Sequence, residues 1–276
     1  MRIGLCGSMV VNDPGLGGVE VAPLLASLGY DYIELSISHL TALDHASFAA
    51  VRKSLYIAGI PCECCNNFFP PYLKLTGPDV HLPEITGYAK TALGRAAELG
   101  ASIVVLGSGQ AKSVPEGFPL AEAWSQLQEL CYLLSKIARK NNITIALEPL
   151  RRAECNIINS VEEALRLCHA VNLPEIRVLA DYYHLKEENE SPLVLLKASR
   201  DLYHVHFANP AGRTFPLSMD EDAGYAEFFS ALRKIIYCHR ISIEGYSVDH
   251  VSDAMASLAF LKGYWQELPE SKDSVR

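Results

Sequence analysis

The sequence predicts a (β/α)₈ barrel (TIM barrel), and three observations support this fold class. Strand-like apolar runs and helical patterns alternate eight times along 276 residues, which is a typical length for one barrel of this kind. Most of the runs are apolar almost throughout, as expected for parallel strands that are covered on both faces. Consecutive runs in the second half end in metal-binding types of side chain. We therefore expect one barrel domain over residues 1–276, with a polar tail from about residue 269.

The strands and helices are placed by apolar periodicity and by the Gly and Pro residues that interrupt it. In the first half, the expected strands are 3–6, 30–36, 60–68 and 102–106, and the expected helices are 19–28, 44–58, 83–99 and 120–140. In the second half, one strand ends at Glu148 and the others are 177–184, 202–208 and 241–246, with helices at 160–171, 192–198, 224–237 and 251–261. A doubly wound open sheet is the alternative, but residues 6–9 (CGSM) lack the Gly-rich turn that it requires after its first strand.

Composition and charge narrow the classes of partner. The formal net charge of −8 disfavours a nucleic-acid-binding protein, whose binding face is usually basic. The sequence has neither a signal-like N-terminus nor an apolar run of about 18 residues, so we expect no membrane span and a cytoplasmic location. The eight cysteines lack the paired spacing of a zinc site, including the cluster at residues 62–65 (CECC), and we expect free thiols that are mostly buried.

Four consecutive strands end in side chains that commonly bind divalent metal ions: Glu148, Asp181, His206 and Glu244. The loops that follow the strands of a barrel form one face, where active sites lie. Alternate residues of a strand share a face, so His204 is placed one layer below His206, as a buried and hydrogen-bonded residue. Arg177 and Arg240 fall at the opposite end of the barrel, where a structural role is expected. Three oxygen ligands and one nitrogen ligand favour one Mn²⁺, Mg²⁺ or Co²⁺ ion, with Zn²⁺ as a further candidate.

The segments that carry these residues resemble the xylose-isomerase-like barrel superfamily. They read LEPLRRAECNIINS, LADYYHL, HVHFANPAGR and IEGY, and they are most similar to the ketose 3-epimerases of the tagatose and psicose type and to sugar-phosphate isomerases and epimerases. The resemblance implies that the four strand-end residues hold one divalent ion and that Glu148 and Glu244 also act as the acid/base pair. It further implies that Glu154, His184 and Arg213 bind the substrate, a small sugar or sugar phosphate, in a chain that could form homo-oligomers.

The chemistry of these residues agrees with the resemblance. Moving a proton next to a sugar carbonyl passes through an enediolate, which a divalent cation stabilises by several kcal/mol. Two carboxylates on opposite sides can remove a proton from one face and return one to the other, which inverts the carbon. We therefore expect a metal-dependent ketose epimerase or isomerase, most specifically a ketose 3-epimerase.

Four other readings use the same barrel. A keto-inositol dehydratase and a hydroxypyruvate-type isomerase remain open, because one barrel supports many reactions. An apurinic-site endonuclease would need additional histidines after the early strands, where this chain has Asn66 and Asn67, and an Asp-x-His pair in the seventh loop, which residues 213–222 lack. A non-catalytic sugar-binding protein is disfavoured because all four metal-ligand candidates are present.

Overall fold

The computed structural model describes residues 1–11 and 14–266, and it confirms the barrel. All strands are parallel and follow one another around a closed barrel in sequence order, with the last pairing with the first. The eight strands are β1 (Arg2–Cys6), β2 (Tyr32–Ser36), β3 (Cys62–Asn66), β4 (Ile103–Leu106), β5 (Thr144–Leu147), β6 (Ile176–Asp181), β7 (Leu202–Phe207) and β8 (Arg240–Ile243). The expected polar tail from residue 269 lies outside the described residues.

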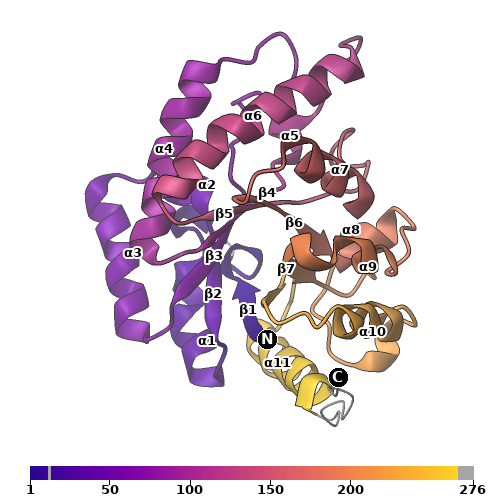
Figure 1. Ribbon diagram of the computed structural model, residues 1–276. Helices are drawn as coiled ribbons and strands as arrows, with labels where there is room; N and C mark the ends of the chain where they lie inside the picture. Colours follow the sequence, from indigo (N-terminus) through magenta and orange to yellow (C-terminus); the bar gives the residue numbers. More distant parts are fainter. Residues whose placement is uncertain (12–13, 267–276) are drawn as a thin grey trace, which may run out of the picture.

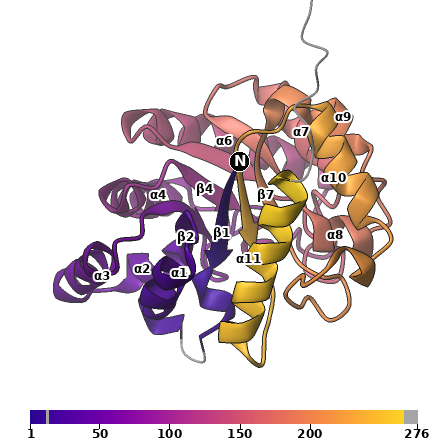
Figure 2. The ribbon, with the colours of Figure 1, turned by 90° about the horizontal axis from the view of Figure 1, so that it is seen from below.

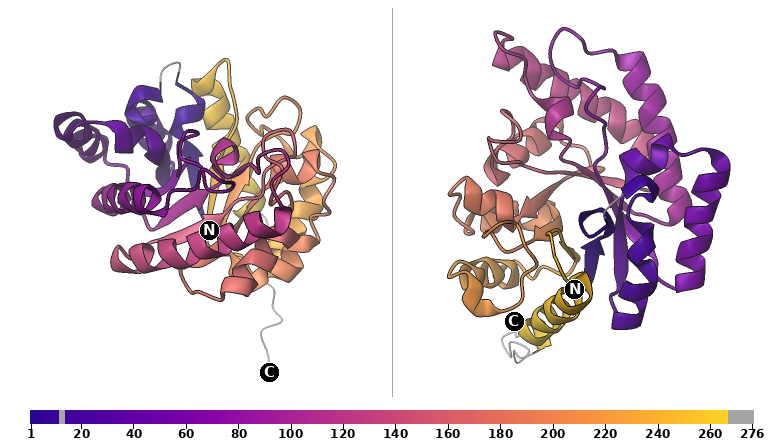
Figure 3. Two further views of the ribbon diagram at one scale, coloured as in Figure 1. Left: turned by 90° about the horizontal axis from the view of Figure 1, so that it is seen from above. Right: turned by 180° about the vertical axis from the view of Figure 1, so that it is seen from behind.

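The helices surround the strands in all four ribbon views (Figures 1, 2 and 3). The outer ring contains α1 (Ala22–Leu28), α3 (His45–Ala58), α4 (Leu82–Leu99), α6 (Leu120–Lys140), α7 (Val161–Val171), α9 (Val194–Ala198), α10 (Tyr225–Lys234) and α11 (His250–Gln266). These helices correspond to the eight that the sequence predicts. The described residues add three short α-helices in the loops after strands: α2 (Ile37–Ala42), α5 (Gly109–Lys112) and α8 (Tyr182–Glu187). Short 3₁₀ segments cover Gly7–Met9, Pro14–Leu16, Val19–Val21, Ser199–Asp201 and Met219–Glu221.

The expectation that one strand covers residues 177–184 is wrong at its end, because Tyr182 to His184 belong to α8. The Asp181 side chain ends the strand by accepting a hydrogen bond from the Tyr183 N–H at 2.8 Å, which caps the helix. The two tyrosines favour a strand when they are judged by propensity alone, but the cap decides the local structure here. Smaller corrections shorten β3, which ends at Asn66, and β8, which ends at Ile243.

The apolar core has two parts, one between the strands and the surrounding helices and one inside the barrel. The larger cluster packs the outer faces of the strands against the helices, as the near-continuous apolar strands predict. A second cluster consists of Tyr32, Cys64, Ile103, Val105, Ala146 and Leu179. Its residues alternate along their strands with residues of the first cluster, so they point into the barrel. The interior is therefore filled with side chains, and the chemistry is confined to the layer at the carboxyl ends of the strands.

Charged residues close the opposite end of the barrel, as expected for Arg177 and Arg240. The Arg240 guanidinium lies 2.6 Å from Glu63, and Arg2 lies 2.5 Å from the same carboxylate. Arg177 stacks on Tyr203 with its guanidinium carbon 5.3 Å from the ring centre. These contacts join strands at the end of the barrel opposite the candidate site, which supports a structural role for Arg177 and Arg240.

All eight cysteines are free thiols, as predicted, and seven of them are buried. The cysteines of β3 therefore contribute to packing in and around the barrel. Among the helices that the structure describes, none combines the length and the apolar character needed to cross a bilayer.

Candidate active site

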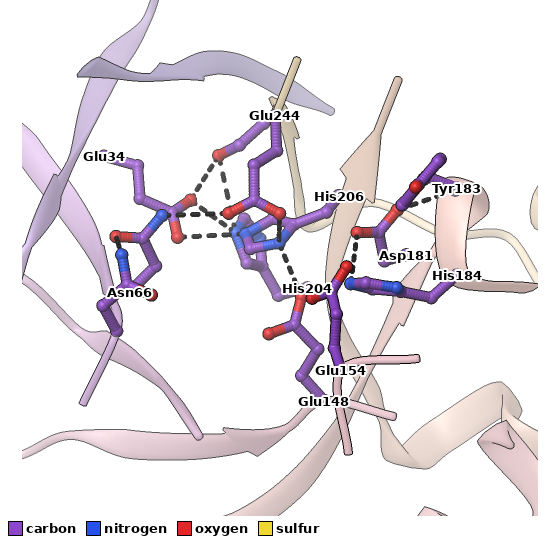
Figure 4. A network of polar contacts seen from close by, with 12 residues as sticks. Glu34, Asn66, Glu148, Glu154, Asp181, Tyr183, His184, His204, His206 and Glu244 are labelled. Carbon is purple, nitrogen blue, oxygen red and sulfur yellow. Dashed lines mark hydrogen bonds and ion pairs between the residues drawn. The ribbon is translucent and has the colours of Figure 1, made fainter. Parts of the chain in front are cut away.

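The four predicted metal ligands meet at the carboxyl ends of the last four strands. Glu148 and Glu244 directly follow β5 and β8, whereas Asp181 and His206 lie in the final residues of β6 and β7. One ligand atom from each residue lies within 4.8 Å of all the others, and all four residues are buried. The Nδ1 atom of His206 is 3.0 Å from Oε1 of Glu148 and 2.9 Å from Oε2 of Glu244 (Figure 4). The strands thus bring together residues that are up to 96 positions apart in sequence, from Glu148 to Glu244.

The electrostatics of this cluster fit a bound divalent cation. Burial, together with Glu244 and Glu148, raises the pKa of Asp181 to about 7, although Arg213 opposes the shift. Burial would also raise the pKa of Glu244, but His206 and Arg213 lower it to about 2. Three buried carboxylates in one small volume repel each other unless positive charge is near. Three oxygen donors and one imidazole form a set that suits a hard or borderline divalent ion.

Glu34 of β2 and Asn66 of β3 add a polar layer on the other side of His206 and Glu244. The Glu34 carboxylate contacts Nε2 of His206 at 3.0 Å and Nε2 of His204 at 2.8 Å. Burial alone would raise the pKa of Glu34, but His206 and His204 hold it well below its usual range. The Nδ2 of Asn66 donates to Oε1 of Glu244 at 3.1 Å. His204 is therefore buried and hydrogen-bonded, as the sequence predicts, and it does not belong to the four-residue cluster.

His184 lies beside the cluster, although a helix, not a strand, carries it. Its Nε2 is 3.5 Å from Oδ2 of Asp181 and makes no hydrogen bond within the described part of the chain. Its Nδ1 accepts the Arg151 backbone N–H at 3.3 Å. Burial and the nearby Arg213 lower the pKa of His184 to about 2, so the imidazole is neutral at physiological pH. Because Nδ1 accepts a hydrogen bond, the neutral ring carries its proton on Nε2. This free N–H at the barrel mouth can donate to a ligand hydroxyl.

Arg213 reaches into the same site from the loop after β7. Its Nη2 lies 2.6 Å from Oε2 of Glu244 and 3.4 Å from Oδ2 of Asp181. Tyr183 lies between two guanidinium groups. Its ring centre is 4.9 Å from the guanidinium carbon of Arg213 and 5.1 Å from the guanidinium carbon of Arg151. Glu154 has the most exposed side chain of the predicted site residues, and it lies 3.9 Å from Nη1 of Arg213 and 2.8 Å from Nε of Arg151. All the predicted site residues are thus gathered at one mouth of the barrel.

Backbone contacts hold the loop that carries Arg213. The Asn209 N–H donates to the Thr214 carbonyl at 2.8 Å, and the Tyr246 N–H donates to the Arg213 carbonyl at 2.8 Å. A Cβ at Gly245 would lie 2.7 Å from the Thr214 carbonyl oxygen, so this close approach requires glycine. The loops after β7 and β8 therefore form one unit over the cluster, and Arg213 is positioned by both.

Lys112 is a site residue that the sequence analysis did not single out. It is 2% exposed, and its ammonium donates to the Glu148 carbonyl oxygen at 2.8 Å. Burial lowers the pKa of this lysine. The contact fixes the backbone where β5 ends and Glu148 begins. A lysine at the end of a four-residue helix gives no sequence signal of this kind, because the contact depends on where the loop after β4 places α5.

A cleft of about 700 Å³ opens beside the cluster, over the ends of the first strands. Its polar lining residues are Ser38, His39, Asn67, Ser108, Gln110 and Glu154, and Phe69 provides an aromatic wall. Asn67 connects the cleft to the cluster, because it bonds to Asn66, which bonds to Glu244. Hydroxyl and amide groups next to an aromatic ring suit a polyhydroxylated ligand.

Comparisons with known proteins find relatives that are similar in sequence. A probable ketose 3-epimerase of Synechocystis sp. is 26% identical over 226 residues, which cover 80% of this chain and 76% of that protein. An L-ribulose 3-epimerase of Methylomonas sp. is 31% identical over 136 residues, or 49% of this chain and 46% of that protein.

Solved structures extend the likeness of the fold to almost the whole chain. The D-allulose 3-epimerase of Methylomonas sp. in complex with D-allulose superimposes with a TM-score of 0.83 at 23% identity, covering 97% of each chain. The D-psicose 3-epimerase of Clostridium cellulolyticum with D-tagatose gives a TM-score of 0.78 at 18% identity, covering 96% of this chain and 99% of that one. The family model described as xylose isomerase-like TIM barrel matches residues 22–264. With that match over most of its length, the chain belongs to the xylose isomerase-like TIM barrel family.

Proposed function

We propose that this chain is a divalent-cation-dependent ketose 3-epimerase. The observation that carries the proposal is the buried cluster of Glu148, Asp181, His206 and Glu244, whose ligand atoms lie within 4.8 Å of one another at the mouth of the barrel. In the proposal these four residues hold one Mn²⁺, Mg²⁺ or Co²⁺ ion. When bound, the cation would supply positive charge next to the carbonyl and hydroxyl oxygens of the sugar, and so stabilise the enediolate.

Glu148 and Glu244 are the acid/base pair in this proposal. They follow β5 and β8, and each lies about one hydrogen-bond length from Nδ1 of His206, at 3.0 and 2.9 Å. One carboxylate removes the proton from the carbon next to the carbonyl, and the bonding electrons form the enediolate. The other carboxyl group returns a proton to the opposite face, which inverts that carbon. The surrounding residues exclude water, since both carboxylates are more than 90% buried.

His184, Glu154 and Arg213 bind and orient the substrate. His184 offers its unpaired Nε2 to a sugar hydroxyl, and Arg213 can donate to an oxygen at the reacting end of the sugar. The residues that line the adjacent cleft include neither Lys nor Arg within the described part of the chain. A phosphate group is usually held by such cations. The first turns of α2 and α5 also line the cleft, but both helices are shorter than two turns. We therefore propose an unphosphorylated ketose as the substrate.

The direct test incubates the protein with Mn²⁺, Mg²⁺ or Co²⁺ and a panel of free ketoses and ketose phosphates in D₂O. We expect a free ketose to yield its C3 epimer with deuterium at C3, because a carboxyl group exchanges its proton with solvent. Epimerisation without deuterium would instead indicate direct hydride transfer and exclude the two-carboxylate route. Turnover of keto-inositols or hydroxypyruvate alone would assign the chain to one of the alternative reactions on this barrel.

A further inference from the structure

One buried carboxylate, Glu34, lies outside the four-residue cluster but contacts its only histidine. Glu34 is fully buried in β2, two residues after Tyr32, which points into the barrel interior. The alternation of a strand therefore directs Glu34 inward as well, and it reaches His206 across the barrel. Figure 4 shows Glu34 and Glu148 on opposite sides of the His206 ring, with Glu244 above the ring in this view.

Three donors converge on the Glu34 carboxylate. Oε1 lies 3.0 Å from Nε2 of His206, and Oε2 lies 2.8 Å from Nε2 of His204. The Ser242 hydroxyl donates to Oε2 at 2.5 Å, and Tyr32 lies 2.8 Å from the Ser242 oxygen, to which it can donate in turn. An ionised carboxylate only accepts hydrogen bonds, so both histidines must present a proton on Nε2.

This arrangement determines which nitrogen of His206 is available to a cation. Nδ1 also faces two carboxylates at hydrogen-bond distance, so without a cation it carries a proton too. A bound cation would replace that proton, and the ring would then keep its proton on Nε2 and offer its lone pair from Nδ1. Nδ1 is the atom that lies 3.0 Å from Glu148 and 2.9 Å from Glu244, on the side of the cluster. His204 supports the same assignment, because its Nδ1 is buried without a partner in the part of the chain that the structure describes. A lone pair is tolerated there, whereas a buried proton without an acceptor would be costly.

We propose that Glu34 is a positioning residue that fixes the tautomer of His206 and aims its Nδ1 lone pair at the cation. The inference rests on the proposed cation site, and it adds a residue from the first half of the barrel to a ligand set that comes from the second half. A carboxylate behind a ligating histidine fixes the orientation of the ring and increases its basicity, and losing such a partner typically weakens metal binding about 10- to 100-fold.

The test compares Glu34→Gln with a matched control, Glu63→Gln. Each variant replaces one carboxylate with the isosteric amide. Glu34 points into the barrel, whereas Glu63 pairs with Arg2 and Arg240 at the opposite end of the barrel. A third variant, Tyr32→Phe, removes the outermost donor of the network and leaves the contact between Glu34 and His206. Circular dichroism and thermal unfolding verify that each protein is folded.

The first readout is the Kd of Mn²⁺, measured by titration calorimetry without any substrate. Glu34→Gln should raise the Kd about 10- to 100-fold, whereas Glu63→Gln and Tyr32→Phe should leave it within about twofold. The second readout is the ¹⁵N spectrum of the imidazoles in Zn²⁺-loaded protein, because Zn²⁺ is diamagnetic. The wild-type His206 should be protonated on Nε2 only, and Glu34→Gln should shift both of its nitrogen signals.

Two outcomes overturn the inference, and they differ from failure of the proposed function. If Glu34→Gln binds Mn²⁺ as tightly as the wild type, Glu34 does not position the ligand. If the wild-type His206 carries its proton on Nδ1 in the loaded protein, the tautomer assignment is wrong. A wild-type chain that binds none of the tested cations would overturn the proposed function together with this inference, whereas the two outcomes above leave the cation site intact.

Discussion

The Arg213 guanidinium lies 2.6 Å from the Glu244 carboxylate, so an arginine from the loop after β7 is bonded to a residue that is also a candidate metal ligand and catalytic base. Its second contact is Asp181, at 3.4 Å. Burial alone would lower the pKa of Arg213, but Glu244 and Asp181 raise it, so this side chain remains charged. Arg213 thus partly neutralises the cluster, and a cation that binds there must compete with it.

Replacing Arg213 should therefore separate cation binding from turnover. In Arg213→Met, which keeps an unbranched chain against Tyr183, the Kd of Mn²⁺ should be unchanged or lower, because a competing positive charge is gone. The value of kcat/KM should fall strongly, with much of the loss coming from a higher KM, because the substrate loses a charged hydrogen-bond donor. Calorimetry and steady-state kinetics measure the two effects. A Kd that rises tenfold would show that Arg213 supports the cation site instead of competing for it.

A bound cation should stabilise the fold measurably. At a free Mn²⁺ concentration of about 100 times its Kd, the free energy of unfolding should rise by about 2.7 kcal/mol, and a chelator should reverse the change. Asp181→Asn should lose this response, since it removes a ligand charge but leaves an oxygen to accept the Tyr183 N–H. Thermal unfolding with and without Mn²⁺ measures both. An Asp181→Asn variant that is stabilised as much as the wild type would contradict the assignment of Asp181 as a ligand.

His184 and Glu154 should affect the substrate and leave the cation in place. His184→Asn and Glu154→Gln each keep a polar side chain but alter the hydrogen bonds available at the barrel mouth. We expect at least a tenfold loss in kcat/KM, which corresponds to about 1.4 kcal/mol, with the metal content unchanged. Elemental analysis and kinetics test this, and loss of metal from both variants would place them among the ligands.

The sequence predicts that the four metal-ligand candidates converge, because one geometric rule suffices. Parallel strands end at the same edge of a barrel, so the polar ends of four consecutive strands must converge, whatever the details of the loops. Asn66 ends β3 with a similar signal, whereas Glu34 lies in the middle of β2. Their roles depend on which side chain crosses the barrel to reach His206 or Glu244, and a pattern of strand ends does not specify that.

Contacts made by loops and short helices are less predictable for a physical reason. Lys112 contacts Glu148 from the short helix α5, which follows Ser108 at a positive φ of 41°. The helix that carries His184 begins because the Asp181 side chain caps it, whereas the same residues read as strand by propensity. In both places tertiary structure or a single hydrogen bond overrides the local preference.

The ion pair between Glu175 and Arg139 gives a pH-dependent prediction that is independent of the active site. The Arg139 guanidinium lies 2.6 Å from Glu175 and, with Ser135, lowers the pKa of that carboxyl to about 2. A depressed pKa adds stability above the ordinary value of 4.5, and this is lost as the pH falls toward 2. Glu175→Gln should therefore cost about 1–2 kcal/mol at pH 7, and the difference from the wild type should narrow below about pH 4.

Urea unfolding across this pH range measures the difference, with Glu162→Gln as the control. Glu162 pairs with Lys197 at 2.8 Å, but both side chains are mostly exposed, so its replacement should change stability less than Glu175→Gln does at pH 7. If the cost of Glu175→Gln stayed constant from pH 7 to about pH 3, the ionised form of Glu175 would not be the source of the stability.

The roles of Glu148 and Glu244 lead to a prediction that distinguishes two bases from one. If each carboxylate serves one face of the reacting carbon, Glu244→Gln still lets Glu148 remove and return a proton on its own face. That variant should exchange the C3 proton of one epimer with D₂O without inverting the carbon, and Glu148→Gln should do the same for the other epimer. Both variants keep an oxygen donor for the cation, so exchange should persist while epimerisation falls by at least about a thousandfold. Proton NMR of each epimer with each variant gives the four rates. If both variants exchanged the C3 proton of the same epimer, a single group would handle that proton. The assignment of one carboxylate to each face would then be wrong.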